Sequence, residues 1–148
     1  MTYRHTQVGT VIIVAVLGAA LVTLVVFVPT AGANTLPALV VFVLTAVALS
    51  LFSWLTVEID KDVITCRFGV GLIRKSIPLS HVEQVHTVVN SWLVGWGIRW
   101  VPGRYWVWNV SGLRAVELVM KDGTRFRIGT DEPEALVRAI ELSKKTDT

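Results

Sequence analysis

The sequence is poor in cysteine, and its first part almost lacks charge. There is a single cysteine, and the first 56 residues contain no acidic residue and one basic residue, Arg4. One cysteine excludes a disulfide scaffold, and an apolar share of 53% excludes a disordered chain. The later residues hold 13 of the 14 basic and all 11 acidic side chains, with no basic run longer than a pair. Because nucleic-acid binding needs a concentrated basic patch, we expect no nucleic-acid partner.

Two long uncharged runs occupy the first part of the chain. Residues 8–28 and 36–55 contain 21 and 20 residues without a charged side chain. As a helix, the first run would be roughly 31 Å long, about the thickness of the hydrocarbon core of a bilayer. A chain in lipid must satisfy its own backbone hydrogen bonds, so each run is expected to be helical. These runs predict a hairpin of two transmembrane helices, and hence residues 1–56 as an anchor integral to the lipid bilayer.

The basic residues near the ends of these runs predict their orientation. Arg4 precedes the first run, Lys61 and Arg67 follow the second, and the segment between the runs has no basic residue. Since basic residues favour the cytoplasmic side, both termini are expected in the cytoplasm. An alternative is a cleaved signal peptide, because Ala31-Gly32-Ala33 resembles a cleavage site. The apolar part of a signal peptide usually has about 7–15 residues, so the longer first run favours a permanent span.

Residues 57–148 have the pattern of one small domain made mostly of strands. Apolar and polar residues alternate in several short runs, such as 64–68, and Lys121-Asp122-Gly123 is a strong hairpin turn. The period then changes to that of a helix, which Glu132-Pro133-Glu134 opens and along which Leu136 and Ile140 form an apolar stripe. We expect an α+β, mainly β domain: about seven antiparallel strands in a curved sheet or split barrel, closed by a C-terminal helix.

Three local motifs follow one another in this part of the chain: Gly95-Trp96-Gly97-Ile98-Arg99, Asn109-Val110-Ser111-Gly112 and Gly129-Thr130-Asp131-Glu132-Pro133. In this order they resemble the bacterial PH-like (pleckstrin-homology-like) membrane proteins. The resemblance implies a PH-like fold of seven strands and a capping helix, on the cytoplasmic side of a bacterial inner membrane. It implies no catalytic activity. Lipid-binding PH domains carry several basic residues around their first hairpin, whereas this turn reads Asp60-Lys61-Asp62, so phosphoinositide binding is not expected.

Residues able to carry out chemistry are scarce. Cys66 alternates with Ile64 and Phe68, which is typical of a small buried core residue. His81 and His86 are five positions apart, a spacing that matches neither a helical nor a strand pair of metal ligands. No phosphate-binding glycine loop, nucleophile elbow or HExxH motif is present. We therefore expect no catalytic residue, no cofactor and no metal site.

The unusual feature is a group of aromatic and basic residues between Trp92 and Trp108. Three interpretations are open: tryptophans that fill the core, a Pro102-Gly103 bend that reaches the bilayer interface, or a contact with a protein partner. Under the last two, the contact residues are predicted to be Trp96, Arg99, Trp100, Arg104, Tyr105 and Trp106.

Together these patterns predict a membrane-anchored PH-like protein that acts as a non-catalytic interaction or scaffold module at the cytoplasmic face of the membrane. Protein partners or self-association through an exposed sheet edge are expected. Replacing Arg99, Arg104 and Trp106 together should then abolish recruitment while the fold remains. Two alternatives are an accessory subunit of a membrane export or transport complex and a membrane-bound enzyme that uses Cys66.

Overall fold

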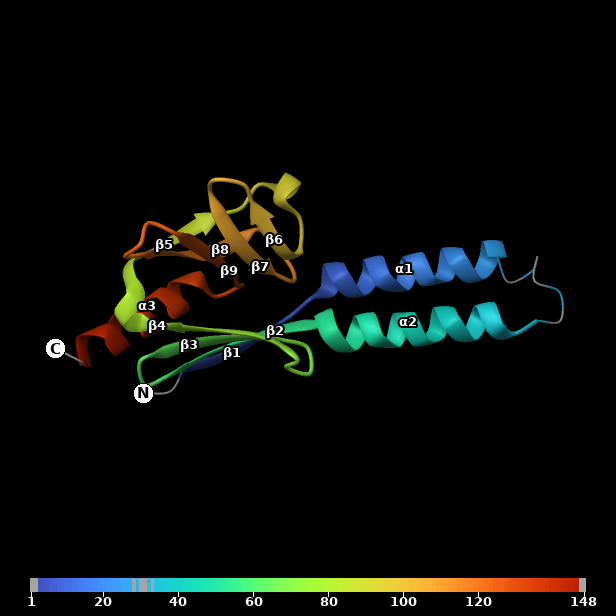
Figure 1. Ribbon diagram of the computed structural model, residues 1–148, viewed down its shortest axis with the longest axis horizontal. Helices are drawn as coiled ribbons and strands as arrows, with labels where there is room; N and C mark the ends of the chain where they lie inside the picture. The colour runs from blue at the N-terminus through green and yellow to red at the C-terminus, as the bar shows by residue number, and fades with distance from the viewer. Residues whose placement is uncertain (1–2, 28, 30–31, 33, 147–148) are drawn as a thin grey trace.

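Two β-sheets form most of the body of the molecule. The computed structural model describes residues 3–27, 29, 32 and 34–146. In Figure 1, the two sheets face each other at one end, and two long helices project side by side from the other. The first sheet consists of β1 (Tyr3–Val8), β2 (Trp54–Asp60), β3 (Val63–Phe68) and β4 (Ile73–Pro78). The second consists of β5 (Val82–Val89), β6 (Gly97–Val101), β7 (Tyr105–Asn109), β8 (Arg114–Met120) and β9 (Arg125–Gly129).

The order of the strands differs between the two sheets. The first sheet runs β1-β2-β3-β4, and every neighbouring pair is antiparallel. The second runs β5-β8-β9-β7-β6, and its one parallel pair joins β7 to β9. The described residues thus form nine strands in two sheets, so the prediction of one curved sheet or split barrel with about seven strands is wrong.

The first sheet gains a strand from the N-terminal residues. β1 pairs along its whole length with β2, from Tyr3 opposite Ile59 to Val8 opposite Trp54. Its side chains alternate between more buried and exposed positions, and Gln7 is buried while Thr6 is exposed. The sequence pattern predicts no strand there, because the apolar run that begins at Val8 dominates it. The sheet therefore takes residues from both ends of the segment expected to be an anchor.

The two long helices are consequently shorter than predicted. α1 (Thr10–Phe27) has 18 residues and α2 (Leu36–Phe52) has 17, because the residues beside them belong to β1 and β2. Val28, and Ala31 and Ala33 of the cleavage-like motif, lie outside the described residues. Within the described part of the chain, no helix is long and apolar enough to cross a membrane. The predicted transmembrane hairpin, and the predicted location as a multi-pass inner-membrane protein with cytoplasmic termini, are therefore wrong.

The transition from helix to sheet is held by backbone hydrogen bonds. Gly9 N donates to Ser53 O at 2.7 Å, and Gly69 N donates to Trp54 O at 2.8 Å. A Cβ on Gly69 would lie 2.0 Å from Ser50 O, and the φ angle of this residue is +47°. Only glycine fits so close to the end of α2 in that conformation. The body and the base of the helices are thus joined through the first sheet.

The core lies between the sheets and is closed by a C-terminal helix, α3 (Pro133–Thr146), at the end far from α1 and α2 (Figure 1). The predicted stripe is confirmed, since Leu136 and Ile140 are fully buried. Thr130 Oγ1 accepts a hydrogen bond from Glu132 N at 3.1 Å, which fixes the chain as it enters the helix. The core also includes residues of both sheets: Leu55, Ile59, Ile64, Phe68, Val116, Leu118 and Ile128.

Candidate interaction surface on the second sheet

The tryptophan-rich segment forms the outer edge of the second sheet. It contains the 3-10 turn η3 (Trp92–Val94) and the hairpin of β6 and β7, and β6 is the last strand of the sheet. The segment divides by exposure. Trp108 is 7% exposed and packs its ring 5.2 Å from that of Phe68 and 5.8 Å from that of Phe126, between centroids. The core-filling interpretation therefore holds for Trp108.

Trp96 has a structural role of a different kind. Its Nε1 donates to the carbonyl oxygen of Gly112 at 3.1 Å. Asn109 Nδ2 donates to the same oxygen at 2.9 Å. The bond from Trp96 joins the loop before β6 to the loop after β7, and the bond from Asn109 joins the end of β7 to the same loop. Trp96, predicted as a contact residue, is thus partly committed to holding the hairpin in place.

Trp100 and Trp106 are the exposed aromatic pair of this hairpin. They face each other across β6 and β7, with ring centroids 6.2 Å apart. Trp106 is also paired with Phe126 of β9, so the three aromatic residues form a row across neighbouring strands. The exposed fraction rises along this row, from 3% at Phe126 to 45% at Trp106 and 58% at Trp100. Lys75 of the first sheet covers Phe126, with its Nζ 4.8 Å from the ring centroid. The aromatic side chains on this face are therefore buried at β9 and increasingly exposed toward β6.

The edge beside this pair is not covered by another strand. Among the described residues, β6 pairs only with β7, so one side of its backbone has no partner strand. Trp92 and Leu93 of η3 are also exposed. Arg99, on β6, is exposed as well, and its place opposite Val107 puts it on the other face from Trp100. We call Trp92, Trp100, Trp106 and the free side of β6 the aromatic edge.

The face of the second sheet that points away from the core carries a buried ion pair. Arg127 Nε donates to Glu117 Oε2 at 2.7 Å, and its Nη1 donates to Asn90 Oδ1 at 3.0 Å. The guanidinium carbon lies 3.6 Å from the centroid of the Tyr105 ring. The side chains of Arg127 and Glu117 are only 16% and 7% exposed. Contacts on three sides thus fix this guanidinium, and Glu117 neutralises it.

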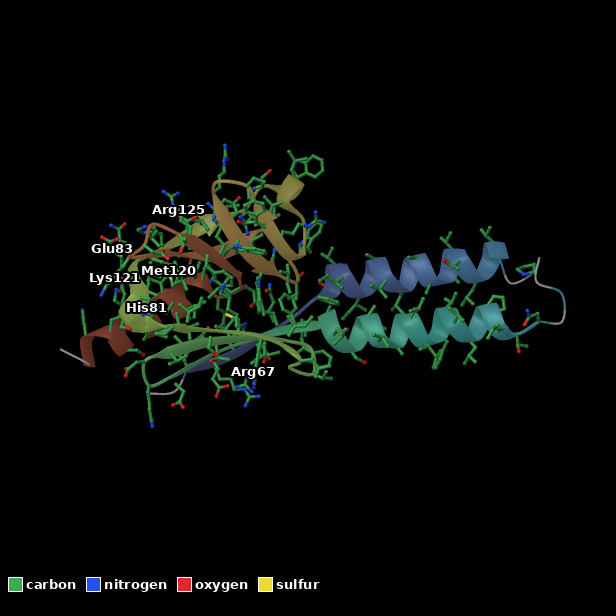
Figure 2. All side chains as sticks on the ribbon, in the orientation of Figure 1. Arg67, His81, Glu83, Met120, Lys121 and Arg125 are labelled. Carbon is green, nitrogen blue, oxygen red and sulfur yellow. The ribbon has the colours of Figure 1, made fainter. Side chains whose placement is uncertain are left out.

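A polar pocket of about 420 Å³ opens on this face, between the β6–β7 turn and the β8–β9 turn. Its volume falls in the usual range of ligand pockets, roughly 300–1,000 Å³. Two of its arginines lie at exposed positions: Arg104, and Arg125, which Figure 2 shows on the side of the second sheet. Arg125 Nη1 lies 3.9 Å from Glu117 Oε1, at the limit of an ion pair. The lining of this arginine pocket is Gly103, Arg104, Tyr105, Gly123, Arg125 and Arg127.

The three residues that the sequence offers for chemistry, Cys66, His81 and His86, lie in different parts of the fold. Cys66 is fully buried in the core, and burial raises the pKa of its thiol to about 12, while the charge of Lys75 acts in the opposite direction. His86 lies opposite Glu117 on the second sheet, and His81 is in the turn η2 (Leu79–His81). In the described residues, no group of three or more His, Cys, Asp or Glu side chains could hold a metal ion.

The structure brings together only part of the predicted contact set. Arg104 and Tyr105 line the arginine pocket, and Trp100 and Trp106 belong to the aromatic edge. Arg99 is exposed on β6, on the opposite face from Trp100. The sequence pattern does not identify Arg125, Arg127 and Glu117 as members of the site, although Arg125 and Arg127 alternate with apolar residues and so share one face of a strand. The contact between Arg127 and Tyr105 depends on the parallel pairing of β7 with β9. No local sequence pattern predicts this pairing.

Comparisons of the sequence with protein-family models and with curated proteins find no match and so assign the chain to no family. The resemblance to PH-like proteins stays a prediction from the three motifs. The function of the chain must therefore be inferred from the aromatic edge and the arginine pocket.

Proposed function

We propose that the chain is a non-catalytic interaction module that binds a protein partner, or a second copy of itself, through the aromatic edge. The observation that carries this proposal is the exposed pair of Trp100 and Trp106 at the edge of the sheet, where the outer side of β6 has no partner strand among the described residues. Tryptophan is enriched where binding energy concentrates in protein interfaces. An open strand edge supplies backbone donors and acceptors for an added strand.

The energetics support the same surface. The side chains of Trp100 and Trp106 each leave about half of their area in water, although Trp108 shows that the fold can bury a tryptophan of this hairpin almost completely. Burying apolar surface is favourable by about 25 cal/mol per Å². A partner that covered both rings would therefore gain binding free energy from a small contact area. The rings already contact each other, so little side-chain freedom would be lost on binding.

The state of Cys66 supports a non-catalytic role. A cysteine nucleophile needs a lowered pKa, partial exposure and an adjacent base. Cys66 has the opposite properties, because it is fully buried and its pKa is raised to about 12. The PH-like resemblance supports the same class of function, since it implies a recognition domain without a characteristic activity.

Site-specific photo-crosslinking in cells tests this proposal. A photoreactive phenylalanine analogue at Trp100 should give an adduct of discrete mass with a protein or with a second copy of the chain. The matched control places the analogue at Ser76 on β4, an edge strand of the first sheet, and should give none. Absence of an adduct from position 100, or equal adducts from both positions, would overturn the proposal.

A further inference from the structure

We infer that the arginine pocket is a binding site for carboxylate side chains, and that the partner of the aromatic edge contacts it with an acidic segment. This inference rests on the proposed function, because it names the chemistry of the same partner. Three guanidinium groups line the pocket, and Glu117 is the acidic side chain that contacts two of them, Arg127 and Arg125. The site is therefore positive, and an anionic group would be attracted to it.

The arginines of the pocket differ in how many of their N–H donors already have a partner within the protein. Arg127 is occupied by Glu117, Asn90 and the Tyr105 ring. Arg104, by contrast, forms no ion pair with an acidic side chain in the described part of the chain, and the contact from Arg125 to Glu117 is long, at 3.9 Å. A guanidinium presents a planar set of N–H donors that matches a carboxylate in bidentate geometry. Arg104 and Arg125 are thus the groups available to a ligand, whereas Arg127 lines the pocket with its guanidinium held by other residues of the protein.

The nearby acidic residue of the β8–β9 turn does not neutralise these arginines through a contact. Asp122 Oδ1 accepts hydrogen bonds from Thr124 N at 2.9 Å and from Thr124 Oγ1 at 2.6 Å. Both bonds close the turn on itself. Gly123, next in the chain, lines the pocket and has open space where a Cβ would be, so the rim is unobstructed there.

The position of Glu117 favours carboxylates over a phosphate group. A phosphate dianion held by all three arginines would lie near this buried carboxylate and be repelled by it. A single carboxylate bound at the exposed rim by Arg104, which does not contact Glu117, would lie farther from that carboxylate than a phosphate held by all three arginines. Available positive charge is also distributed along the hairpin, from Arg99 on β6 to Arg104 in the turn. That distribution fits several separate charges on an extended chain.

The pocket is continuous with the aromatic edge through the β6–β7 turn. Arg104 follows the last residues of β6 and lines the pocket, and Tyr105 opens β7 opposite Val101. A segment added alongside β6 would therefore reach the pocket as it passes the turn at Gly103. Residues at alternate positions of such a segment would share the face of Arg99, because side chains alternate along a strand. The ligand that fits this arrangement is an extended segment with an acidic side chain at every second position.

Fluorescence anisotropy with a labelled peptide tests the inference on the full chain. The probe is an octapeptide of alternating glutamate and valine, and the control peptide has glutamine in place of glutamate. The glutamate peptide should bind at least tenfold more tightly at constant ionic strength. The double variant Arg104→Gln/Arg125→Gln should weaken its binding at least tenfold.

A matched variant removes the same charge from the other side of the molecule. Arg67 and Arg74 are paired neighbours on β3 and β4, and Arg67 lies on the side of the first sheet in Figure 2. Arg67→Gln/Arg74→Gln should change binding less than twofold. Equal losses in the two double variants, or equal affinity for both peptides, would overturn the inference. So would displacement of the peptide by inorganic phosphate at a lower concentration than by glutarate, which would mark a phosphate site instead.

Failure of this inference can be told apart from failure of the proposed function. The peptide reports on the pocket directly, whereas crosslinking from position 100 reports on the aromatic edge. A crosslink without peptide binding would keep the interaction module and reject its acidic partner. Thermal unfolding of both double variants at the wild-type temperature would confirm that each is folded, as expected for exposed arginines.

Discussion

Trp106 and Trp108 lie two residues apart on the same strand, on the same face, and have different environments. Trp108 lies under the first sheet, against Phe68 and Phe126, and is almost completely buried. Trp106 lies closer to the β6–β7 turn, is about half exposed and contacts Trp100. The comparison shows that a cluster of one residue type can serve two purposes, and that the extent of the covering sheet decides which residue serves which.

The largest effect is expected from breaking the buried side of this comparison. Trp108→Ala should lower the free energy of unfolding by about 3–5 kcal/mol, because it leaves a cavity between two other rings. Urea unfolding followed by circular dichroism measures it. A loss below about 1 kcal/mol would show that Trp108 does not belong to the core.

A smaller loss is expected where the backbone beside Trp108 packs closely. A Cβ on Gly129 would lie 2.1 Å from Oδ1 of the buried Asn109, whose Nδ2 donates to Gly112 O at 2.9 Å. Gly129→Ala should therefore cost about 1–3 kcal/mol through overpacking. The control is Gly18→Ala in α1, where a Cβ would meet nothing within 4 Å. Equal unfolding free energies for the two variants would contradict this account.

The pH dependence of stability tests the burial of Cys66 in the same core. Its pKa is raised from 9.0 to about 12 in the folded chain, so between these values the unfolded chain loses the proton first. The contribution of the buried Cys66 thiol to the free energy of unfolding is therefore fully present below pH 9. It falls as the pH rises, by roughly 1 kcal/mol at pH 10. Urea midpoints at pH 8 and pH 10 measure the fall.

Cys66→Ala is the control for this measurement, since it removes the thiol. The variant should lose this part of the pH dependence. Tyr3, whose pKa is raised to about 12, mainly by burial and also by Glu132 and Asp131, acts in the same direction above pH 10 in both proteins. The same fall between pH 8 and pH 10 in both proteins would show that another group titrates.

The smallest effect is expected on the exposed side of the comparison. Trp106→Ala should change the free energy of unfolding by less than about 1 kcal/mol, because much of the ring is already in water. Under the proposed function, the same change should strongly reduce the crosslink from position 100. A loss of stability as large as that of Trp108→Ala would assign Trp106 to the core instead.

Much of the body could be predicted from local patterns. The alternation of Ile64, Cys66 and Phe68 gives β3, all three are buried, and the glycine of Lys121-Asp122-Gly123 marks the turn between β8 and β9. The helix after Thr130 was also predicted. These features depend on residues close in the chain, whose side-chain period and turn preferences act locally.

The errors arise where distant residues compete for the same segment. Val8 and Leu55 were assigned to helices because both belong to uncharged runs, yet each pairs in a sheet across about 50 residues of chain. The candidate site shows the same limit. Arg104 and Tyr105 were predicted as contact residues, but Arg125, Arg127 and Glu117 join them only through strand pairing.

By itself, the sequence determined the two apolar helices, the β-rich body with its closing helix, and the burial of its single cysteine. Each follows from composition and from the spacing of apolar side chains. Tertiary structure alone decided where the helices end, which tryptophans are buried and which arginines share a pocket. The physical reason is that strand pairing and coverage by another sheet depend on contacts between residues far apart in the chain, and local periodicity carries no record of them.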